Sequence, residues 1–153
     1  MSMTTQDSVG RLEEALLTAV TNAVGAGISP GIGTDIVAVD RIRQARSKSG
    51  GRLDTLAFTR SEIAYCTAKR YPEIHFAGHL AAKEAVYKAL RLNWDMAFSW
   101  RFMEIRHRPD GSPYVTFNPD DRELARFPES DRVSISIAHT ADHAIAAACV
   151  LTG

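Results

Sequence analysis

Hydrophobic and polar positions follow two different periods along this chain, and the change from one period to the other marks most of the expected elements. Near the N-terminus, apolar residues recur at helical spacing over residues 12–24. This spacing predicts a short amphipathic helix that ends at Gly25 and Gly27. Residues 31–39, GIGTDIVAV, are rich in β-branched side chains and predict a buried strand.

The remainder of the chain mixes helical and strand patterns irregularly. Thr59 and Glu62 have the spacing of a capping box, so a helix is expected to begin near Arg60. A longer helix is expected over residues 74–90, and a short one over residues 120–127. Strand patterns cover residues 100–108, 114–117, 133–138 and 144–151, with a turn signal at residues 109–111. Such a mixture favours an α+β fold over a doubly wound parallel sheet.

Composition narrows the class of protein. The 153 residues suit one domain, here residues 31–153, preceded by an N-terminal extension of residues 1–30 that carries the amphipathic helix. The formal net charge of zero argues against bulk nucleic-acid binding. There is no signal-peptide pattern and no apolar stretch of membrane-spanning length, so a cytoplasmic protein without membrane contact is expected. Cys66 and Cys149 cannot form a disulfide framework and fit a reducing compartment.

Several familiar binding and catalytic motifs are incomplete or absent in this sequence. GIGTDIV begins like a dinucleotide fingerprint, but Ile36 stands where the third glycine should be. His75 and His79 are four residues apart, as in a zinc protease, but Phe76 occupies the position of the required glutamate. Neither a Walker phosphate loop nor a GxSxG nucleophile motif is present.

The residues that remain are Asp35 in a strand of small residues, Glu84 and Lys88 one turn apart on a helix, and His139 at a strand end. Two carboxylates with phosphate oxygens and waters suit Mg²⁺, which is seldom enclosed by protein ligands alone. Spacing alone favours an ordinary exposed Glu84–Lys88 pair, worth only ~0.3–0.5 kcal/mol. Asp35 is different, because a charge inside an apolar strand is costly unless it is paired or metal-bound.

At these residues the chain resembles the holo-acyl-carrier-protein synthase family, the small 4′-phosphopantetheinyl transferases. The segments GIGTDIVAVDRI, FTRSEIAYC, AAKEAVYKAL and VSISIAHT match in order and, with the turn DGSPYV, extend over most of residues 31–151. The resemblance implies the fold of that family, a single domain in which an antiparallel-rich sheet packs against a long helix.

The resemblance also implies an activity, the Mg²⁺-dependent transfer of phosphopantetheine from coenzyme A to a serine of an apo acyl carrier protein or carrier domain. The other product is adenosine 3′,5′-bisphosphate. On the matching positions, Asp35 and Glu84 are expected to bind Mg²⁺, and Lys88 to contact the pyrophosphate. Lys88, His139 and Lys83 are the expected coenzyme A contacts. The general base is either Glu84 or a metal-bound water that it orients.

The expected partner is a carrier of fatty-acid or polyketide synthesis, and the expected assembly is a homotrimer with active sites between subunits. Carrier proteins present acidic helices, and residues 41–52 are rich in Arg and Lys. Complementary charge would raise the encounter rate more than the affinity. Arg41 matches a position that the family uses for carrier docking, and the resemblance makes Arg41, Arg43 and Lys48 the expected docking residues. An ordinary solvated surface would have the same composition.

The chain also departs from the family pattern. His79-Leu80 replaces an arginine and an aromatic residue, Ser112 replaces a basic residue, Ala138 replaces a serine, and residues 91–94 replace a glycine-rich turn. These changes leave open a non-catalytic relative that binds carriers or coenzyme A as an interaction module. A third alternative is an unrelated α+β domain whose Glu84–Lys88 pair is ordinary surface.

Overall fold

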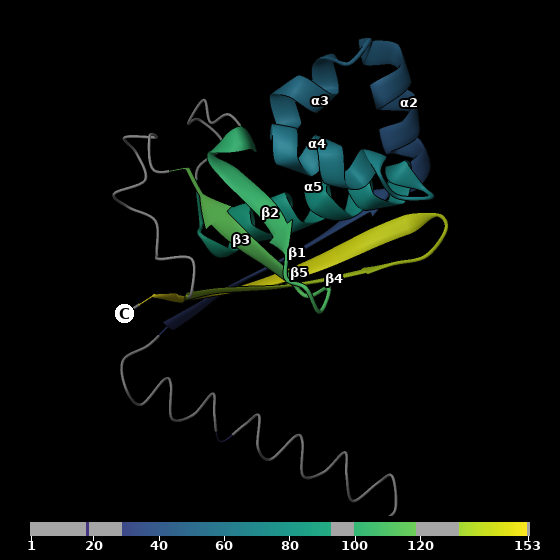
Figure 1. Cartoon of the computed structure of the whole chain (residues 1–153). Coiled ribbons are helices and arrows are strands. Elements are labelled where there is room, and N and C mark those ends of the chain that lie inside the picture. Colours follow the sequence, from purple (N-terminus) through teal and green to yellow (C-terminus); the bar gives the residue numbers. More distant parts are fainter. Residues whose placement is uncertain (1–17, 19–28, 93–99, 119–131, 153) are drawn as a thin grey trace, which may run out of the picture.

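One long helix lies across one face of an antiparallel sheet (Figure 1). The structure is a computed structural model that describes residues 18, 29–92, 100–118 and 132–152. The helix is α5 (Pro72–Ala89), and the sheet has the order β1 (Ser29–Ala38), β5 (His143–Thr152), β4 (Val133–His139). The predicted α+β class, with an antiparallel-rich sheet against a long helix, is confirmed.

The other elements cover the far side of α5. Three short helices follow β1 along the chain: α2 (Val39–Ser49), α3 (Arg52–Ala57) and α4 (Arg60–Thr67). A separate hairpin pairs β2 (Met103–His107) with β3 (Pro113–Phe117), and a 3-10 helix, η1 (Trp100–Phe102), precedes it. Figure 1 shows α2–α4 and the hairpin on the side of α5 opposite the sheet.

The sheet approaches α5 very closely along β1, and two glycines make this approach possible. Alternate residues of β1 face the helix, among them Gly31, Gly33, Asp35 and Val37. A Cβ atom on Gly33 would collide with the carbonyl oxygen of Ala85. One on Gly31 would collide with a backbone carbonyl one turn further along the helix. The glycines that looked like the start of a dinucleotide fingerprint are therefore packing residues.

Alanines on the other side of this contact have the same effect. Five of the buried residues of α5 are alanines, and those at positions 77, 81, 82 and 85 are fully excluded from solvent. On β5, Ala144, Ala146 and Ala148 face the helix and are buried, whereas Ile145 on the opposite face is 48% exposed. Small side chains on α5 and on the sheet allow β1 and β5 to pack tightly against the helix. The position of α5 is therefore fixed relative to these two strands.

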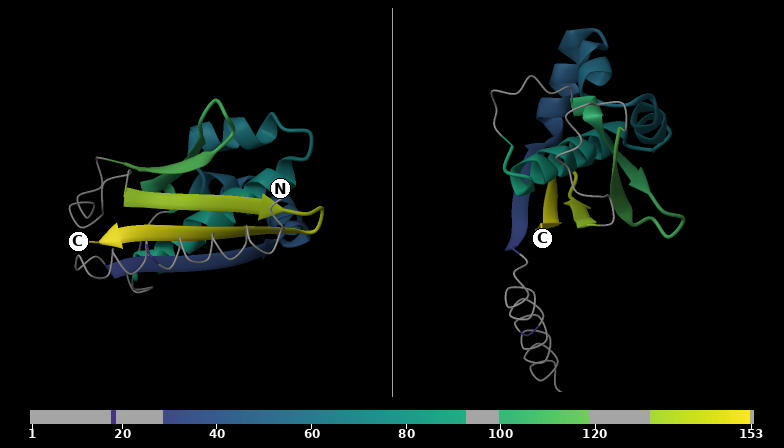
Figure 2. Two further views of the ribbon diagram at one scale, coloured as in Figure 1. Left: turned by 90° about the horizontal axis from the view of Figure 1, so that it is seen from below. Right: turned by 90° about the vertical axis from the view of Figure 1, so that its left-hand side faces the viewer.

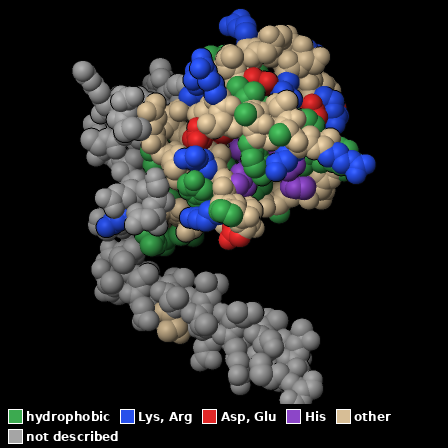
Figure 3. Space-filling model, in the orientation of Figure 1, with side chains coloured by type: hydrophobic (Ala, Val, Ile, Leu, Met, Phe, Trp, Pro, Cys, Tyr) green, Lys and Arg blue, Asp and Glu red, His purple; other side chains and the backbone are tan. Residues whose placement is uncertain are grey.

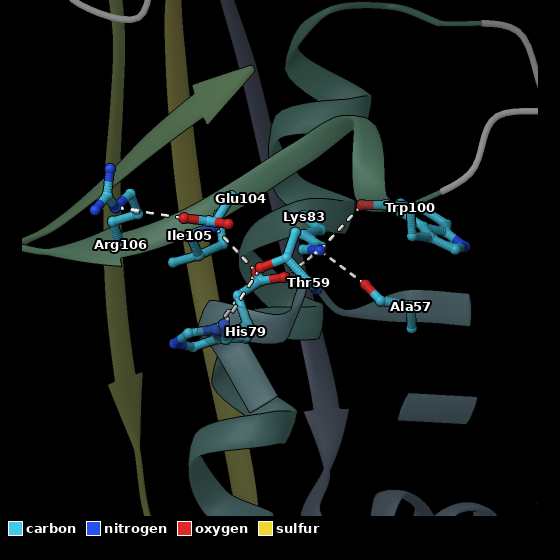
Figure 4. Close-up of polar contacts among 9 residues, drawn as sticks. Ala57, Thr59, His79, Lys83, Trp100, Glu104, Ile105 and Arg106 are labelled. Atoms are coloured by element: carbon cyan, nitrogen blue, oxygen red, sulfur yellow. Dashed lines mark hydrogen bonds and ion pairs between the residues drawn. The ribbon is translucent and has the colours of Figure 1, made fainter. Parts of the chain in front are cut away.

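The capping box at the start of α4 is confirmed, and its glutamate has a second role. The Thr59 side chain accepts a hydrogen bond from Glu62 N, and Glu62 Oε2 accepts one from Thr59 N at 2.7 Å. Glu62 is also buried and lies 2.7 Å from Lys83 Nζ, while its other oxygen accepts a hydrogen bond from Ile105 N at 3.0 Å. This one carboxylate thus links α4, α5 and β2, and Figure 4 labels its partners Thr59, Lys83 and Ile105.

Three sequence predictions differ from the structure or fall outside the described residues. The strand expected over residues 100–108 begins only at Met103, because residues 100–102 form η1 and the Trp100 carbonyl accepts a hydrogen bond from Lys83 Nζ at 3.0 Å. The helices expected over residues 12–24 and 120–127 lie outside the described residues, apart from Thr18, which is helical. Among the described helices, none has both the length and the apolar character needed to cross a membrane.

Candidate active site

Asp35 and Lys88 meet across the contact between β1 and α5, although 53 residues separate them in the sequence. Lys88 Nζ lies 2.8 Å from Asp35 Oδ1 and also donates a hydrogen bond to the Thr34 carbonyl oxygen at 2.9 Å. The Asp35 side chain is 19% exposed and that of Lys88 is 43% exposed. The pair therefore sits at the border between the packed interior and solvent, where a ligand can reach it.

Glu84 completes the group, one helical turn before Lys88. Burial raises the pKa of Glu84 above its usual value, and the negative charge of Asp35 raises it further. The positive charges of Lys88 and Arg41 act in the opposite direction. Since Lys88 contacts Asp35 and Glu84 lies one turn before Lys88 on α5, three of the residues singled out in the sequence, Asp35, Glu84 and Lys88, lie in one region.

Two half-buried carboxylates that repel each other form a place where a cation would be stabilised. Among the residues that the structure describes, no group of three or more acidic, histidine or cysteine side chains could enclose a metal. Mg²⁺ does not require such an enclosure, because it keeps several waters and takes one or two carboxylates together with substrate phosphates. Asp35 and Glu84 fit that requirement. A cation there would compete with Lys88 for Asp35 and leave the ammonium free for another anion.

Lys83 does not belong to this group. Its side chain is fully buried, and its ammonium contacts Glu62 Oε2 at 2.7 Å and the carbonyl oxygens of Ala57 and Trp100 at 2.7 and 3.0 Å (Figure 4). An ammonium has three protons to donate, and these three partners use them all. The expected coenzyme A contact of Lys83 does not fit this position, so we assign it a structural role.

His139 is the last residue of β4, as expected, but it lies in a different place from Asp35 and Glu84. It lines a pocket with other histidines, and its ring centroid is 5.8 Å from that of His75. Within the described part of the chain, no hydrogen bond or ion pair joins His139 to either carboxylate. In the sequence, His75 and His79 stood out only as a pair four residues apart on one helix. That spacing does not predict a cavity, because the pocket also needs residues from other elements.

The three expected docking residues lie on α2 but do not share one surface. Arg41 and Lys48 line a shallow groove along the helix together with Gln44. Arg43 is not among the residues of that groove and forms an exposed ion pair with Asp40 at 2.9 Å. The groove begins at Ala38, the last residue of β1, the strand that also carries Asp35.

One further basic residue of the 41–52 segment is not available for docking. The Arg46 guanidinium binds Asp54 at 2.8 Å and Glu73 at 3.3 Å, and it lies 3.7 Å from the centre of the Phe76 ring. Because Asp54 and Glu73 lie on other helices, Arg46 ties α2 to α3 and α5.

Known proteins resemble this chain over most of its length. The family model described as the 4′-phosphopantetheinyl transferase superfamily matches residues 31–148. A holo-acyl-carrier-protein synthase of Protochlamydia amoebophila is 39% identical over 116 residues, which are 76% of this chain and 93% of that protein. One of Desulforudis audaxviator is 38% identical over the same share of the chain and 88% of its own length.

Solved structures show the same fold. The holo-acyl-carrier-protein synthase of Helicobacter pylori, in complex with coenzyme A, is 29% identical. It covers 79% of this chain and 99% of its own with a TM-score of 0.66. The synthase of Neisseria meningitidis is also 29% identical, with coverages of 78% and 96% and a TM-score of 0.68.

Proposed function

Because this chain belongs to the 4′-phosphopantetheinyl transferase superfamily, as an enzyme of the holo-acyl-carrier-protein synthase type, we propose that it modifies an apo carrier protein with Mg²⁺ as cofactor. The substrate is coenzyme A, and the acceptor is a serine of an acyl carrier protein or carrier domain of fatty-acid or polyketide synthesis. The observation that supports this proposal most strongly is the convergence of Asp35, Glu84 and Lys88 at one half-exposed position.

The chemistry is a displacement at phosphorus. The serine oxygen of the carrier attacks the β-phosphorus of coenzyme A, and a new P–O bond forms. The bond from that phosphorus to the bridging oxygen breaks, and adenosine 3′,5′-bisphosphate leaves with the bonding electrons. Mg²⁺ held by Asp35 and Glu84 would neutralise negative charge on the pyrophosphate. Lys88, released from Asp35, places its ammonium on the leaving phosphate and stabilises charge as the bond breaks.

The serine proton passes to Glu84, either directly or through a water that Glu84 orients. In the metal-free site, burial and the charge of Asp35 raise the pKa of Glu84, and a cation bound there would oppose that effect. Proton transfer and charge neutralisation are therefore placed within one turn of α5.

The carrier docks along the groove of α2. Arg41 and Lys48 present positive charge there, and Arg41 also influences Glu84. An acidic carrier helix in this groove would bring its serine toward the carboxylates. A docking role for Arg43 stays a prediction, because Arg43 lies outside the groove and forms an ion pair with Asp40.

Reversing both groove charges, with Arg41→Glu and Lys48→Glu, is expected to lower kcat/KM for the carrier by about tenfold or more, because like charges oppose the encounter. The value of kcat should change less. The matched control is Arg52→Glu, an exposed basic residue of the same segment on α3. The kinetic constants of the wild type, the double variant and the control are measured by steady-state kinetics with a purified apo carrier. Equal losses in the control and the double variant would show that net charge, rather than this groove, matters.

The assembly is a homotrimer formed through the outer face of the three-stranded sheet. In the view from below, β1, β5 and β4 lie in front of α5 (Figure 2), and no described helix or strand covers them. Ile32 and Ile36 on β1 are 71% and 62% exposed, and Ile145 and Leu151 on β5 are 48% and 43% exposed. Apolar side chains gathered on one sheet face indicate a protein interface.

Light scattering of the full chain should give about three times its 16.8 kDa mass. Ile36→Asp is expected to shift the protein toward monomers, because it places a charge in the buried interface. Leu56→Asp, at an equally exposed position on α3, should leave the trimer intact. A monomeric wild-type protein at micromolar concentration would contradict this assignment.

The transfer itself is tested by incubating the protein with coenzyme A, Mg²⁺ and a panel of apo carriers and weighing each carrier intact. A mass gain of one phosphopantetheine that disappears when the metal is chelated supports the proposal. Binding of carrier or coenzyme A without any mass gain across the panel would favour the non-catalytic alternative. The cytoplasmic location expected from the sequence stays a prediction.

A further inference from the structure

The ammonium of Lys88 contacts one of the two carboxylates proposed to bind the cation. Its Nζ atom lies 2.8 Å from Asp35 Oδ1 and 2.9 Å from the main-chain carbonyl oxygen of Thr34. Both acceptors belong to consecutive residues of β1, so two hydrogen bonds tie this lysine of α5 to one short stretch of the strand. An ammonium has three protons to donate, and these two acceptors leave one proton for solvent or a ligand.

This ion pair differs from an ordinary ion pair at the surface. Figure 3 shows acidic side chains close to Lys and Arg side chains at several places on one face of the molecule. The exposed Arg43–Asp40 pair, for example, lies within a single helix, α2. The Lys88–Asp35 pair instead joins a helix to a strand, and its acidic partner is a candidate metal ligand. Breaking this pair therefore changes what the site can bind.

The second carboxylate of the site, that of Glu84, is not held in the same way. Within the described part of the chain, its side chain forms no ion pair or hydrogen bond. Burial raises the pKa of Glu84, the charge of Asp35 raises it further, and the charges of Lys88 and, more weakly, Arg41 oppose this effect. The metal-free site is thus asymmetric, because the one ammonium contacts Asp35 and leaves Glu84 without a partner.

Lys88 stands in the way of a cation that would bind both carboxylates. The ammonium already uses Asp35 Oδ1, and a cation at the other oxygen of Asp35 would still lie next to it. Two positive charges at such short range repel each other. If the ammonium moved away without a substrate, it would lose both of its hydrogen bonds to β1. In the empty protein, Lys88 therefore opposes metal binding.

Coenzyme A changes the position that is favourable for Lys88. Its pyrophosphate offers anionic oxygens that the ammonium can bind in place of Asp35, and the lysine side chain is flexible and 43% exposed. The same oxygens complete the coordination of Mg²⁺, which takes one or two carboxylates together with substrate phosphates. Each ligand thus favours the position of Lys88 that the other ligand requires, and such coupling is reciprocal.

We propose that Lys88 is a latch on the metal site, which holds Asp35 until coenzyme A draws the ammonium away, so that the cation binds tightly only together with coenzyme A. This proposal rests on the proposed function, because it takes coenzyme A as the substrate and Asp35 and Glu84 as the ligands. Lys88 then has two roles: it contacts the pyrophosphate in the complex, and it suppresses metal binding in the empty protein. A residue that only contacts phosphate would lack the second role.

Binding of Mn²⁺ to the full chain without coenzyme A, followed by electron paramagnetic resonance, tests the latch independently of catalysis. Lys88→Met removes the ammonium and keeps an unbranched side chain, and this variant is expected to bind Mn²⁺ about fivefold or more tightly than the wild type. Circular dichroism of the same samples establishes that both proteins are folded. Unchanged or weaker binding of Mn²⁺ in the folded variant would overturn the proposal.

Arg41→Met is the matched control for the loss of a positive charge near the site. Arg41 is exposed and its charge acts on Glu84, but no ion pair joins it to Asp35 among the described residues. This variant should change the affinity for Mn²⁺ less than about twofold at physiological salt, because exposed charges are screened. An increase as large as that in Lys88→Met would show a general effect of charge and contradict the latch.

The coupling to coenzyme A is measured with the same proteins, after correction for Mn²⁺ bound by free coenzyme A. In the wild type, saturating coenzyme A should raise the affinity for Mn²⁺ about tenfold or more. Direct coordination of the metal by the pyrophosphate contributes to this ratio in every variant. In Lys88→Met the ratio should be smaller than in the wild type, because this variant has no ammonium to displace. An equal ratio in both proteins would count against the proposal.

The outcomes for the latch are separate from those for the proposed function. If the wild type modifies a carrier but Lys88→Met binds Mn²⁺ no more tightly, the latch is absent and the proposed function stands. If metal and coenzyme A binding are coupled through Lys88 but no carrier gains mass, the latch stands and the transferase proposal is removed.

Discussion

Replacing Glu84 by glutamine is expected to lower phosphopantetheine transfer at least about 100-fold while the protein remains folded. Substitutions that disturb only the outer partners of a metal site already cost ~10–100-fold, and Glu84→Gln removes one of the two proposed ligands. It also removes the candidate base. Glutamine has nearly the same size and keeps one oxygen, so packing along α5 should be preserved. Initial rates and circular dichroism of the same samples measure both effects.

The matched control is Glu73→Gln, the same change on the same helix. Glu73 forms a partly exposed ion pair with Arg46 at 3.3 Å, so its loss should cost less than ~1 kcal/mol of stability and leave transfer intact. Full turnover in Glu84→Gln would show that the site is assigned wrongly even though the family is right.

Replacing Lys83 by methionine is expected to destabilise the protein by ~3–5 kcal/mol, which is the usual cost of removing one partner from a buried ion pair. Burial lowers the pKa of Lys83, against the attraction of Glu62. Burial also opposes the ionisation of Glu62, but His79, Lys83 and the Ile105 amide together hold its pKa below the usual value. Without the ammonium, Glu62 would be buried with its charge uncompensated. Urea unfolding followed by fluorescence measures the change.

Lys88→Met is the matched control, with the same substitution on the same helix. The Lys88–Asp35 pair has similar geometry, at 2.8 Å, but the Lys88 side chain is 43% exposed. Its loss should therefore cost no more than ~1 kcal/mol of stability. The double variant Glu62→Gln/Lys83→Met should recover part of the loss, because no uncompensated charge remains. If Lys83→Met lowered the free energy of unfolding no more than Lys88→Met, the buried Lys83–Glu62 pair would not stabilise the protein as described.

Local rules in the sequence predicted much of this fold. The capping box at Thr59 and Glu62 gave the start of α4, and the turn signal at residues 109–111 gave the β2–β3 hairpin. These predictions succeed because the interactions involved span only a few residues. The predicted start of β2 was wrong because it depends on a contact between distant residues. The Trp100 carbonyl accepts a hydrogen bond from Lys83, which belongs to α5.

In the candidate site too, relations within one element were predicted and contacts between elements were not. The relation between Glu84 and Lys88 follows from helix geometry, and the resemblance supplied Asp35 as their neighbour. The sequence did not distinguish Lys83 from Lys88, although one is buried against Glu62 and the other is exposed beside Asp35. Which face of α5 packs inward depends on elements that join it only in the folded chain. The histidine pocket was missed because α4, α5, β2 and β4 each contribute to it.

The central claim is that Asp35 and Glu84 bind one divalent cation together. Anomalous diffraction from crystals grown with Mn²⁺ and coenzyme A measures this directly. A single anomalous peak is predicted, within bonding distance of both carboxylates and of a pyrophosphate oxygen, and it should be absent in crystals of Glu84→Gln. Coenzyme A bound with no peak between these two side chains, in a protein that still modifies its carrier, would contradict the claim.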